Sequence, residues 1–246
     1  GPRVHLQNPP PESSQRIHPL GDVRAWGVCH NGAAISICGI AIRGRGMRGL
    51  ILDGGLRGTG ATDAARQAVV ELLEGRGWKV DSVTLAEQKI AYCLGCFECW
   101  TKTPGICRID DDGREVTAAM LASDLVVYLS PVTFGGYSSA LKKALDRSIC
   151  LVSPFFTRID GEVHHRARYA HYPSVLGVGV LAAPDPAQEE IFGHLIVRNA
   201  INLHAPTCGS CVVYTGQSAA AMTAAMDKAM AELAVPAIER VLEGSR

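Results

Sequence analysis

Short apolar runs alternate along this chain with longer stretches in which apolar residues recur every three or four positions. The runs have the length of buried strands, at residues 50–52, 79–83, 125–129, 175–181 and 211–214. The longer stretches have the period of amphipathic helices, at residues 62–76, 188–203 and 218–242, the last with a bend near Pro236. A short helix up to Ala122 is predicted after Asp110-Asp111-Asp112-Gly113. A further helix, capped by Ser138 or Ser139, is predicted to carry one apolar stripe of Leu141, Leu145, Ile149 and Val152.

Strands that alternate with helices of this size form parallel sheets whose two faces are covered by helices. We therefore predict an α/β fold with a doubly wound, five-stranded parallel sheet in the strand order 2-1-3-4-5. The alternation begins at Met47, whereas residues 1–46 contain consecutive prolines, scattered glycines and one short apolar run. We expect residues 1–46 to form an irregular N-terminal extension, disordered or in part not native, and residues 47–246 to form the domain.

Charge and hydropathy narrow the class of partner. The 24 Lys and Arg residues balance the 24 Asp and Glu residues, so the chain has no net field to attract nucleic acid. The apolar runs are far shorter than the roughly 20 residues that span a bilayer. These features favour a small-molecule partner over nucleic acid or a membrane.

Two loops at the predicted carboxyl edge of the sheet have the composition of ligand sites. The first, GGLRGTGAT at residues 54–62, combines glycines, hydroxyl groups and a helix N-terminus, which suits a phosphate; the alternative is a plain strand-to-helix turn. It has neither the dinucleotide-binding glycine spacing nor a P-loop. The second, SPVTFGGY at residues 130–137, offers the rings of Phe134 and Tyr137 to a planar ligand, or else to packing.

The segments GGLRGTGAT, CLGCFEC with IDDDG, and SPVTFGGYSSALKKALDR occur in an order that matches a known family. From about Met47 to Tyr214 the chain resembles the flavodoxin-like NAD(P)H-dependent FMN reductases, and in particular their iron–sulfur flavoprotein branch. The resemblance implies a flavodoxin-like fold, FMN as cofactor and NAD(P)H as electron donor. It implies phosphate contacts at Arg57, Thr59, Gly60, Ala61 and Thr62, and flavin-ring contacts at Pro131, Val132, Thr133, Phe134 and Gly135. The chain departs from the family pattern at Gly55, Leu56 and Thr133, where the family has serine, proline and tyrosine.

Four of the nine cysteines lie within fifteen positions, at Cys93, Cys96, Cys99 and Cys107. The first three have the spacing by which one loop binds several irons of a cubane, and the fourth returns after a turn at Pro104-Gly105. The resemblance implies a [4Fe–4S] cluster here. Four thiolates also suit tetrahedral zinc, and free thiols or a reversible disulfide stay open.

The cysteine count also bears on the compartment. Nine is an odd number, and no convincing secretion signal opens the chain, so we expect a reducing, cytoplasmic setting. Clustered cysteines there bind metals or do redox chemistry more often than they form structural disulfides. The pair Cys208 and Cys211 falls at the start of the last strand, away from the expected flavin loops, and is interpreted as structural.

The resemblance implies an FMN-dependent NAD(P)H oxidoreductase that reduces a quinone, nitro compound or flavin, or passes electrons through the cluster. The flavin carries this chemistry, so we assign no catalytic acid or base to the protein. The alternative is a flavodoxin-like electron carrier or redox sensor that acts on a protein partner. The family also implies a homodimer or homotetramer. His165 or Arg168, in a long polar connection, is expected to contact NAD(P)H or substrate, or to lie in a subunit contact.

Overall fold

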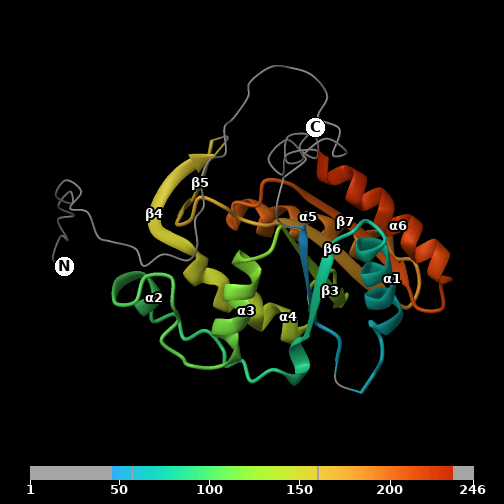
Figure 1. The fold of residues 1–246 in the computed structure, drawn as a ribbon, viewed down its shortest axis with the longest axis horizontal. Helices are drawn as coiled ribbons and strands as arrows, with labels where there is room; N and C mark the ends of the chain where they lie inside the picture. Colours follow the sequence, from blue (N-terminus) through green and yellow to red (C-terminus); the bar gives the residue numbers. More distant parts are fainter. Residues whose placement is uncertain (1–45, 57, 160, 235–246) are drawn as a thin grey trace. The chain divides into compact units, whose positions relative to one another are not determined.

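The computed structural model describes residues 46–56, 58–159 and 161–234 (Figure 1). The predicted N-terminal extension and the predicted bend near Pro236 lie outside these ranges. The elements in chain order are β1 (Arg48–Asp53), α1 (Asp63–Glu74), β2 (Lys79–Thr84), η2 (Leu85–Glu87), α2 (Glu98–Thr101), α3 (Asp112–Leu121), β3 (Leu125–Pro131), α4 (Ser139–Arg147), η3 (Ser148–Leu151), β4 (Val152–Ile159), β5 (Glu162–Ala167), β6 (Ser174–Leu181), α5 (Pro186–Asn202), β7 (Cys208–Tyr214), α6 (Ala219–Ala231) and η4 (Glu232–Ala234).

Five of these strands form one parallel sheet in the order β2-β1-β3-β6-β7. Since β4 and β5 belong to a separate hairpin, this is the predicted order 2-1-3-4-5, and the doubly wound fold is confirmed. Parallel strands place all their carboxyl ends at one edge. Asp53 at the end of β1 therefore pairs with Leu129 near the end of β3, and the two expected ligand loops leave the sheet side by side.

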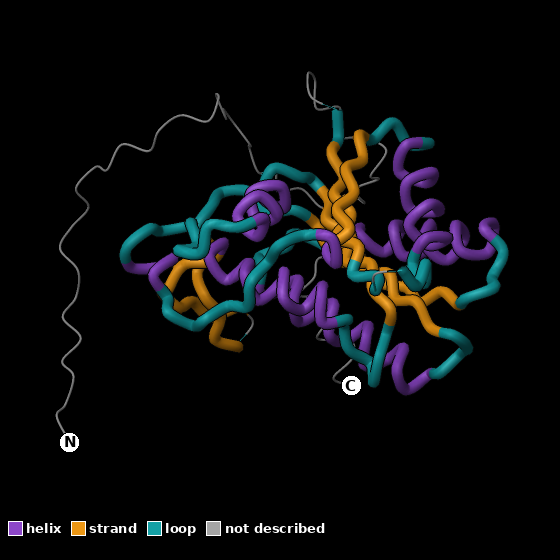
Figure 2. Tube along the Cα trace, turned by 90° about the horizontal axis from the view of Figure 1, so that it is seen from below, coloured by secondary structure: helices purple, strands orange, loops and turns teal. Residues whose placement is uncertain are grey.

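Alternate residues of the central strands face two different helical layers. Leu50 and Val126 face α3, α4 and α5 in one apolar core, whereas Ile51 and Val127 face α1 and α6 in the other. Figure 2 shows helices on both sides of the central strands. This two-sided burial explains why the strand sequences are apolar at consecutive positions. The methionines of α6, Met222, Met226 and Met230, pack into the second core.

The segment after α4 departs from the prediction. The helix capped by the Ser138 hydroxyl ends at Arg147, and Val152, predicted to continue its stripe, begins β4. Pro154 accounts for this, because proline is not tolerated in a helix interior and favours extended backbone before it. The predicted polar connection is likewise an antiparallel β4–β5 hairpin, in which Ile159 pairs with Glu162 across a turn. The sequence signal for this hairpin is the dipeptide Asp160-Gly161.

No helix in the described part of the chain is long and apolar enough to cross a membrane.

Candidate functional site

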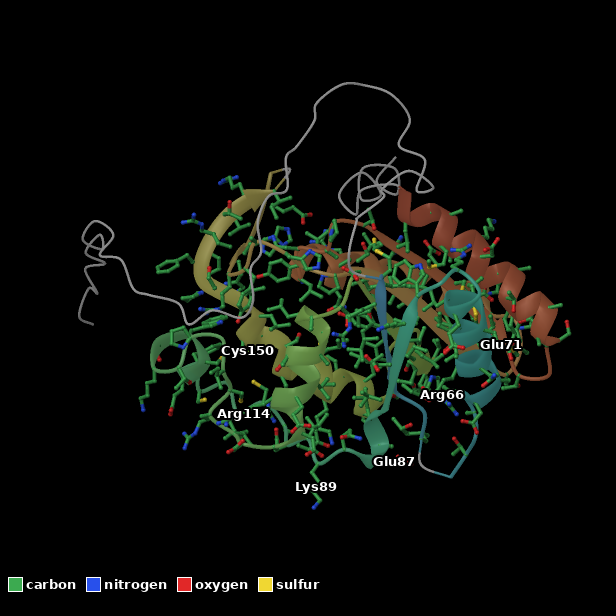
Figure 3. All side chains as sticks on the ribbon, in the orientation of Figure 1. Arg66, Glu71, Glu87, Lys89, Arg114 and Cys150 are labelled. Atoms are coloured by element: carbon green, nitrogen blue, oxygen red, sulfur yellow. The ribbon has the colours of Figure 1, made fainter. Side chains whose placement is uncertain are left out.

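The loop after β1 is built on the buried carboxylate of Asp53, which is 3% exposed. This carboxylate accepts hydrogen bonds from the Gly55 amide at 2.8 Å and from the Thr62 hydroxyl at 2.7 Å. On its other oxygen, Arg66 Nε lies at 3.2 Å, and Figure 3 labels Arg66 on α1 beside this loop. A buried carboxylate is costly unless it is paired and hydrogen-bonded, so these three partners fix the shape of the loop.

The predicted phosphate-binding residues are placed unequally for that role. The hydroxyl of Thr62 donates to Asp53 and that of Thr59 donates to the Leu56 carbonyl, so neither has a hydrogen left for a phosphate. Within the described residues, the amide N–H groups of Gly60 and Thr62 donate to no other group, while that of Ala61 reaches the Thr59 hydroxyl at 3.4 Å. Arg57 lies outside the described residues. The structure thus offers backbone N–H groups as anion donors.

Gly55 stands where the family pattern has serine, and the structure gives a reason. A Cβ atom at this position would lie 2.3 Å from the Thr62 hydroxyl oxygen and 3.0 Å from the Asp53 carboxylate. The bond between Asp53 and Thr62 therefore occupies the space of a side chain at residue 55. We attribute the glycine at position 55 to this hydrogen bond, which leaves no room for a larger residue.

The two expected ligand loops are in direct contact. The Gly54 amide donates to the Leu129 carbonyl at 2.8 Å. A Cβ atom at Gly54 would lie 2.6 Å from the hydroxyl oxygen of Ser138, the N-cap of α4. The phosphate loop and the loop after β3 therefore border one site at the carboxyl edge of the sheet.

The loop after β3 is a tight turn that presents one aromatic ring to solvent. Thr133 and Gly136 exchange backbone hydrogen bonds, and between them Phe134 and Gly135 have φ of 51° and 75°. A non-glycine residue in this left-handed region is strained, yet the Phe134 side chain is 92% exposed. Strain at an exposed ring is a feature of ligand sites, which fits the expected flavin contact.

The other predicted ring residues hold this turn in place. Pro131 ends β3, and the Val132 amide donates to the Val180 carbonyl of β6 at 2.9 Å. The ring of Tyr137 packs edge-on against Tyr128 and Phe192, as in the packing alternative for this residue. Contact of Tyr137 with a flavin ring stays a prediction.

Sequence reasoning missed Gln188, which secures the turn from α5. Its side-chain oxygen accepts from the Gly135 amide at 3.3 Å, while its side-chain amide donates to Asp185, the N-cap of α5, at 2.7 Å. The signal was present as a capping pattern, Asp185 followed three residues later by Gln188.

The four clustered cysteines line a single pocket. Arg147 and Ile149, from the C-terminal end of α4 and from η3, complete its wall beside residues 93–97, Cys99 and 107–109. Cys93 and Cys96 are exposed, Cys107 is half-buried and Cys99 is buried. In the described part of the chain, no three Cys, His, Asp or Glu side chains are close enough to hold one metal ion.

Burial and mutual proximity shape the thiol chemistry of this pocket. The pKa of Cys99 is raised, first by burial and then by the neighbouring thiols of Cys107, Cys93 and Cys96. Behind it, burial raises the pKa of Cys150 to about 11. Figure 3 labels Cys150 and Arg114. Four cysteines thus line one pocket, and three of them act electrostatically on the buried Cys99. Cysteine thiolates are the ligands of iron–sulfur clusters, so this donor set fits such a group.

The cysteine pocket and the flavin-ring loop lie at opposite ends of α4. The loop after β3 enters this helix at Ser138, and the pocket wall leaves it at Arg147. A helix of nine residues separates the two by roughly 13 Å along its axis. One short helix thus connects the two sites within the chain.

The family model for NADPH-dependent FMN reductase matches residues 47–195, which include both ligand loops and all four clustered cysteines. The chain belongs to the NADPH-dependent FMN reductase family. The matched range begins one residue before β1 and ends within α5. The family supports FMN binding and flavin oxidoreductase activity.

Curated relatives that match part of this chain are iron–sulfur flavoproteins. An iron–sulfur flavoprotein of Methanosarcina thermophila is 34% identical over 84 residues, which are 34% of this chain and 43% of that protein. One from Methanocaldococcus jannaschii is 32% identical over 102 residues, which are 42% of this chain and 52% of that protein. The chain spans about half the length of the curated relatives it matches.

Solved structures agree on the fold. An NAD(P)H:quinone oxidoreductase from Methanothermobacter marburgensis aligns with a TM-score of 0.56 at 12% identity, covering 75% of this chain and 94% of that one. An azoreductase from Bacillus anthracis aligns with a TM-score of 0.52 at 12% identity, covering 74% and 96%. At such identity the likeness shows the flavodoxin-like fold of the FMN reductases alone.

The remaining candidate residues make contacts within the hairpin, the cysteine segment and the sheet. Arg168 donates to the carbonyls of Cys150 and Val152, and the ring of His165 packs between Trp100 and Phe156. Cys208 and Cys211 both lie within β7, where Cys208 is buried. Both placements describe packing of the hairpin and the sheet, and contact of His165 or Arg168 with NAD(P)H stays a prediction.

Proposed function

We propose that this chain is an FMN-dependent oxidoreductase that takes electrons from NAD(P)H and delivers them to a small acceptor such as a quinone, nitro compound or flavin. We further propose that Cys93, Cys96, Cys99 and Cys107 hold a [4Fe–4S] cluster. The observation that carries the first proposal is the contact between the loop after β1 and the loop after β3 at one sheet edge. Such an edge is where ligands bind in doubly wound sheets.

The chain's own residues supply binding and orientation. The amides of Gly60 and Thr62 are available to the phosphate, and Arg66 offsets the charge of Asp53 beneath it. The turn at residues 133–136, held by Val180 and Gln188, presents Phe134 to the flavin ring. When bound, FMN supplies hydride acceptance and electron transfer in one or two steps.

The spacing of the cysteines supports a cluster over zinc. Thiolates around one tetrahedral zinc ion lie about 4 Å apart, because each Zn–S bond is about 2.3 Å long. Cubane thiolates bind different irons and stand farther apart. The four cysteines line one pocket, and the first three have the sequence spacing by which one loop binds several irons of a cubane.

Steady-state turnover tests the enzyme proposal. The full chain, saturated with FMN, is expected to oxidise NADPH or NADH rapidly with a quinone as acceptor. Turnover that appears only with a protein partner would contradict this proposal and favour an electron carrier. For the cluster, Cys107→Ala is expected to abolish iron retention, whereas the matched control Cys150→Ala, just behind the pocket, retains it. Equal iron in both variants would overturn the ligand assignment.

A further inference from the structure

Arg147 is the most buried charged residue beside the cysteine pocket. Its side chain is 1% exposed, although it ends α4 and lines the pocket. Its two terminal nitrogens pair with both oxygens of Asp111 at 2.8 Å each. A planar, two-bond pairing of this kind is the strongest arrangement between a guanidinium and a carboxylate. The pair therefore holds a fixed charge arrangement at the floor of the cysteine pocket.

This ion pair joins the two ends of the cysteine loop. Arg147 also donates to the carbonyls of Ala91 at 3.0 Å and Ile109 at 3.3 Å, while Asp111 accepts from the Ala91 amide at 2.8 Å. Ala91 lies two residues before Cys93, and Ile109 lies two residues after Cys107. The loop that carries all four cysteines is thus closed at its base by one guanidinium and one carboxylate.

Gly113 makes room for the guanidinium. A Cβ atom at Gly113 would lie 2.9 Å from the Asp111 carboxylate and 3.2 Å from the central carbon of the Arg147 guanidinium. The Gly113 amide also donates to Asp111, which caps α3. Glycine in the first turn of a helix costs stability, so its presence here fits a packing requirement.

One donor of Arg147 remains unused. A guanidinium has five N–H donors, and the two terminal nitrogens make the bonds described above. Nε is buried and makes no hydrogen bond among the described residues, although, after Asp111, the thiol of the neighbouring Cys107 interacts with the guanidinium and helps to raise the pKa of Arg147. A buried donor without an acceptor is costly, and in a side chain that lines a pocket it indicates an acceptor that belongs to a bound group.

We propose that Arg147 is the positioning residue of the four-cysteine centre. With Asp111 it clamps the base of the cysteine loop, and its free Nε–H serves a sulfur acceptor of the group that the four thiolates bind. The clamp stands on the geometry alone, whereas the role toward sulfur rests on the proposed cluster. Hydrogen bonds to the sulfurs and nearby charge set the reduction potential of iron–sulfur centres, so Arg147 should raise it.

Amide hydrogen exchange on the full chain, as purified and without added iron, tests the clamp. In Arg147→Gln, the Ala91 amide hydrogen is expected to exchange with solvent about tenfold faster, because the hydrogen bonds of the guanidinium to this base are lost. Arg108→Gln is the matched control, because Arg108 lines the same pocket but is half-exposed and pairs only with Glu98. Unchanged exchange in Arg147→Gln would overturn the clamp. If Arg147→Gln does not fold, Gly113→Ala replaces it, because the added methyl group crowds the guanidinium without altering charge. The Ala91 amide is then expected to exchange faster by the same factor, and unchanged exchange in Gly113→Ala would overturn the clamp.

The reduction potential after iron and sulfide reconstitution tests the role toward sulfur. Arg147→Gln is expected to shift the potential to more negative values and Asp111→Asn to more positive values, with Arg108→Gln close to wild type. Arg147→Lys, which keeps the charge, should recover part of the shift. Shifts of the same sign in Arg147→Gln and Asp111→Asn would mean a purely structural role and overturn this part. A wild-type chain that takes up no iron would contradict the proposed cluster and this role together, while the exchange data still decide the clamp.

Discussion

The hydroxyl of Thr62 and the carboxylate of Asp53 form a buried hydrogen bond of 2.7 Å beneath the predicted phosphate loop. This bond spans the loop from the end of β1 to the N-cap of α1. It holds the loop in a conformation in which, among the described residues, the amides of Gly60 and Thr62 donate to no other group.

Thr62→Val keeps the shape of the side chain and removes this donor. The Asp53 carboxylate then lacks one buried partner, so the free energy of unfolding should fall by about 1–3 kcal/mol, and FMN affinity should fall with it. Urea unfolding and a fluorescence titration with FMN measure the two effects. Thr59→Val is the control, since both hydrogen bonds of that hydroxyl, to the Leu56 carbonyl and from the Ala61 amide, are exposed. Equal stability of both variants would show that the buried bond does not organise the loop.

Replacing Phe134 should separate stability from flavin binding. Phe134→Gly relieves a left-handed φ of 51° and exposes no core, so stability should be unchanged or rise by up to about 1 kcal/mol. FMN affinity should nevertheless fall by up to about tenfold, because an aromatic contact is lost. Phe134→Tyr, which keeps the ring, should bind FMN like wild type. Undiminished FMN affinity in the glycine variant would contradict the role of the ring.

Gly135 should tolerate no side chain. An alanine Cβ would lie 2.4 Å from Ile191 Cγ2 at a φ of 75°, so Gly135→Ala should lose about 2 kcal/mol or more of stability. The neighbouring Gly136→Ala is the control, since its nearest contact would be 3.5 Å away. Thermal unfolding of both variants compares them. Similar melting temperatures of the two variants would mean that the turn at residues 133–136 can shift away from Ile191 of α5 without loss of stability.

Acid pH should weaken the Arg147–Asp111 pair. The hydrogen bonds from Arg147 lower the pKa of Asp111, against the opposing effect of burial. The unfolded chain, with an ordinary carboxyl pKa near 3.9, therefore binds this proton more readily than the folded chain. The pair contributes stability above about pH 4 and loses it as pH falls through the lower folded pKa. Asp111→Asn should thus have a lower free energy of unfolding than wild type at pH 7, and this difference should be smaller at pH 3. Urea unfolding at both pH values measures it, and a difference that does not change with pH would contradict the role of the Asp111 charge.

Much of the fold followed from the sequence because its signals are local. Strands such as Leu125–Pro131 are apolar at consecutive positions, and the helices α4, α5 and α6 begin at side-chain caps, Ser138, Asp185 and Ser218. The β4–β5 hairpin was missed because its strands carry Pro154, His164 and Arg166 without a continuous apolar face. Its turn dipeptide was the one local signal.

The candidate site was less predictable, because its key contacts join distant residues. The cysteine spacing marked the loop, but Arg147 looked like an ordinary end of an amphipathic helix, and only the fold brings it to Ala91 and Ile109. The roles of Asp53 and Gln188 likewise depend on partners across loops. Hydroxyl groups assigned to phosphate from the sequence prove to be engaged within the protein.

The most direct test of the account is the ultraviolet–visible spectrum of anaerobically purified full chain, combined with flavin, iron and acid-labile sulfide analysis. Flavin absorption bands are expected, present on purification or after addition of FMN, together with iron and sulfide in the proportions of a [4Fe–4S] cluster. A chain that shows no flavin bands and binds no added FMN would contradict the central claim, whatever its iron content.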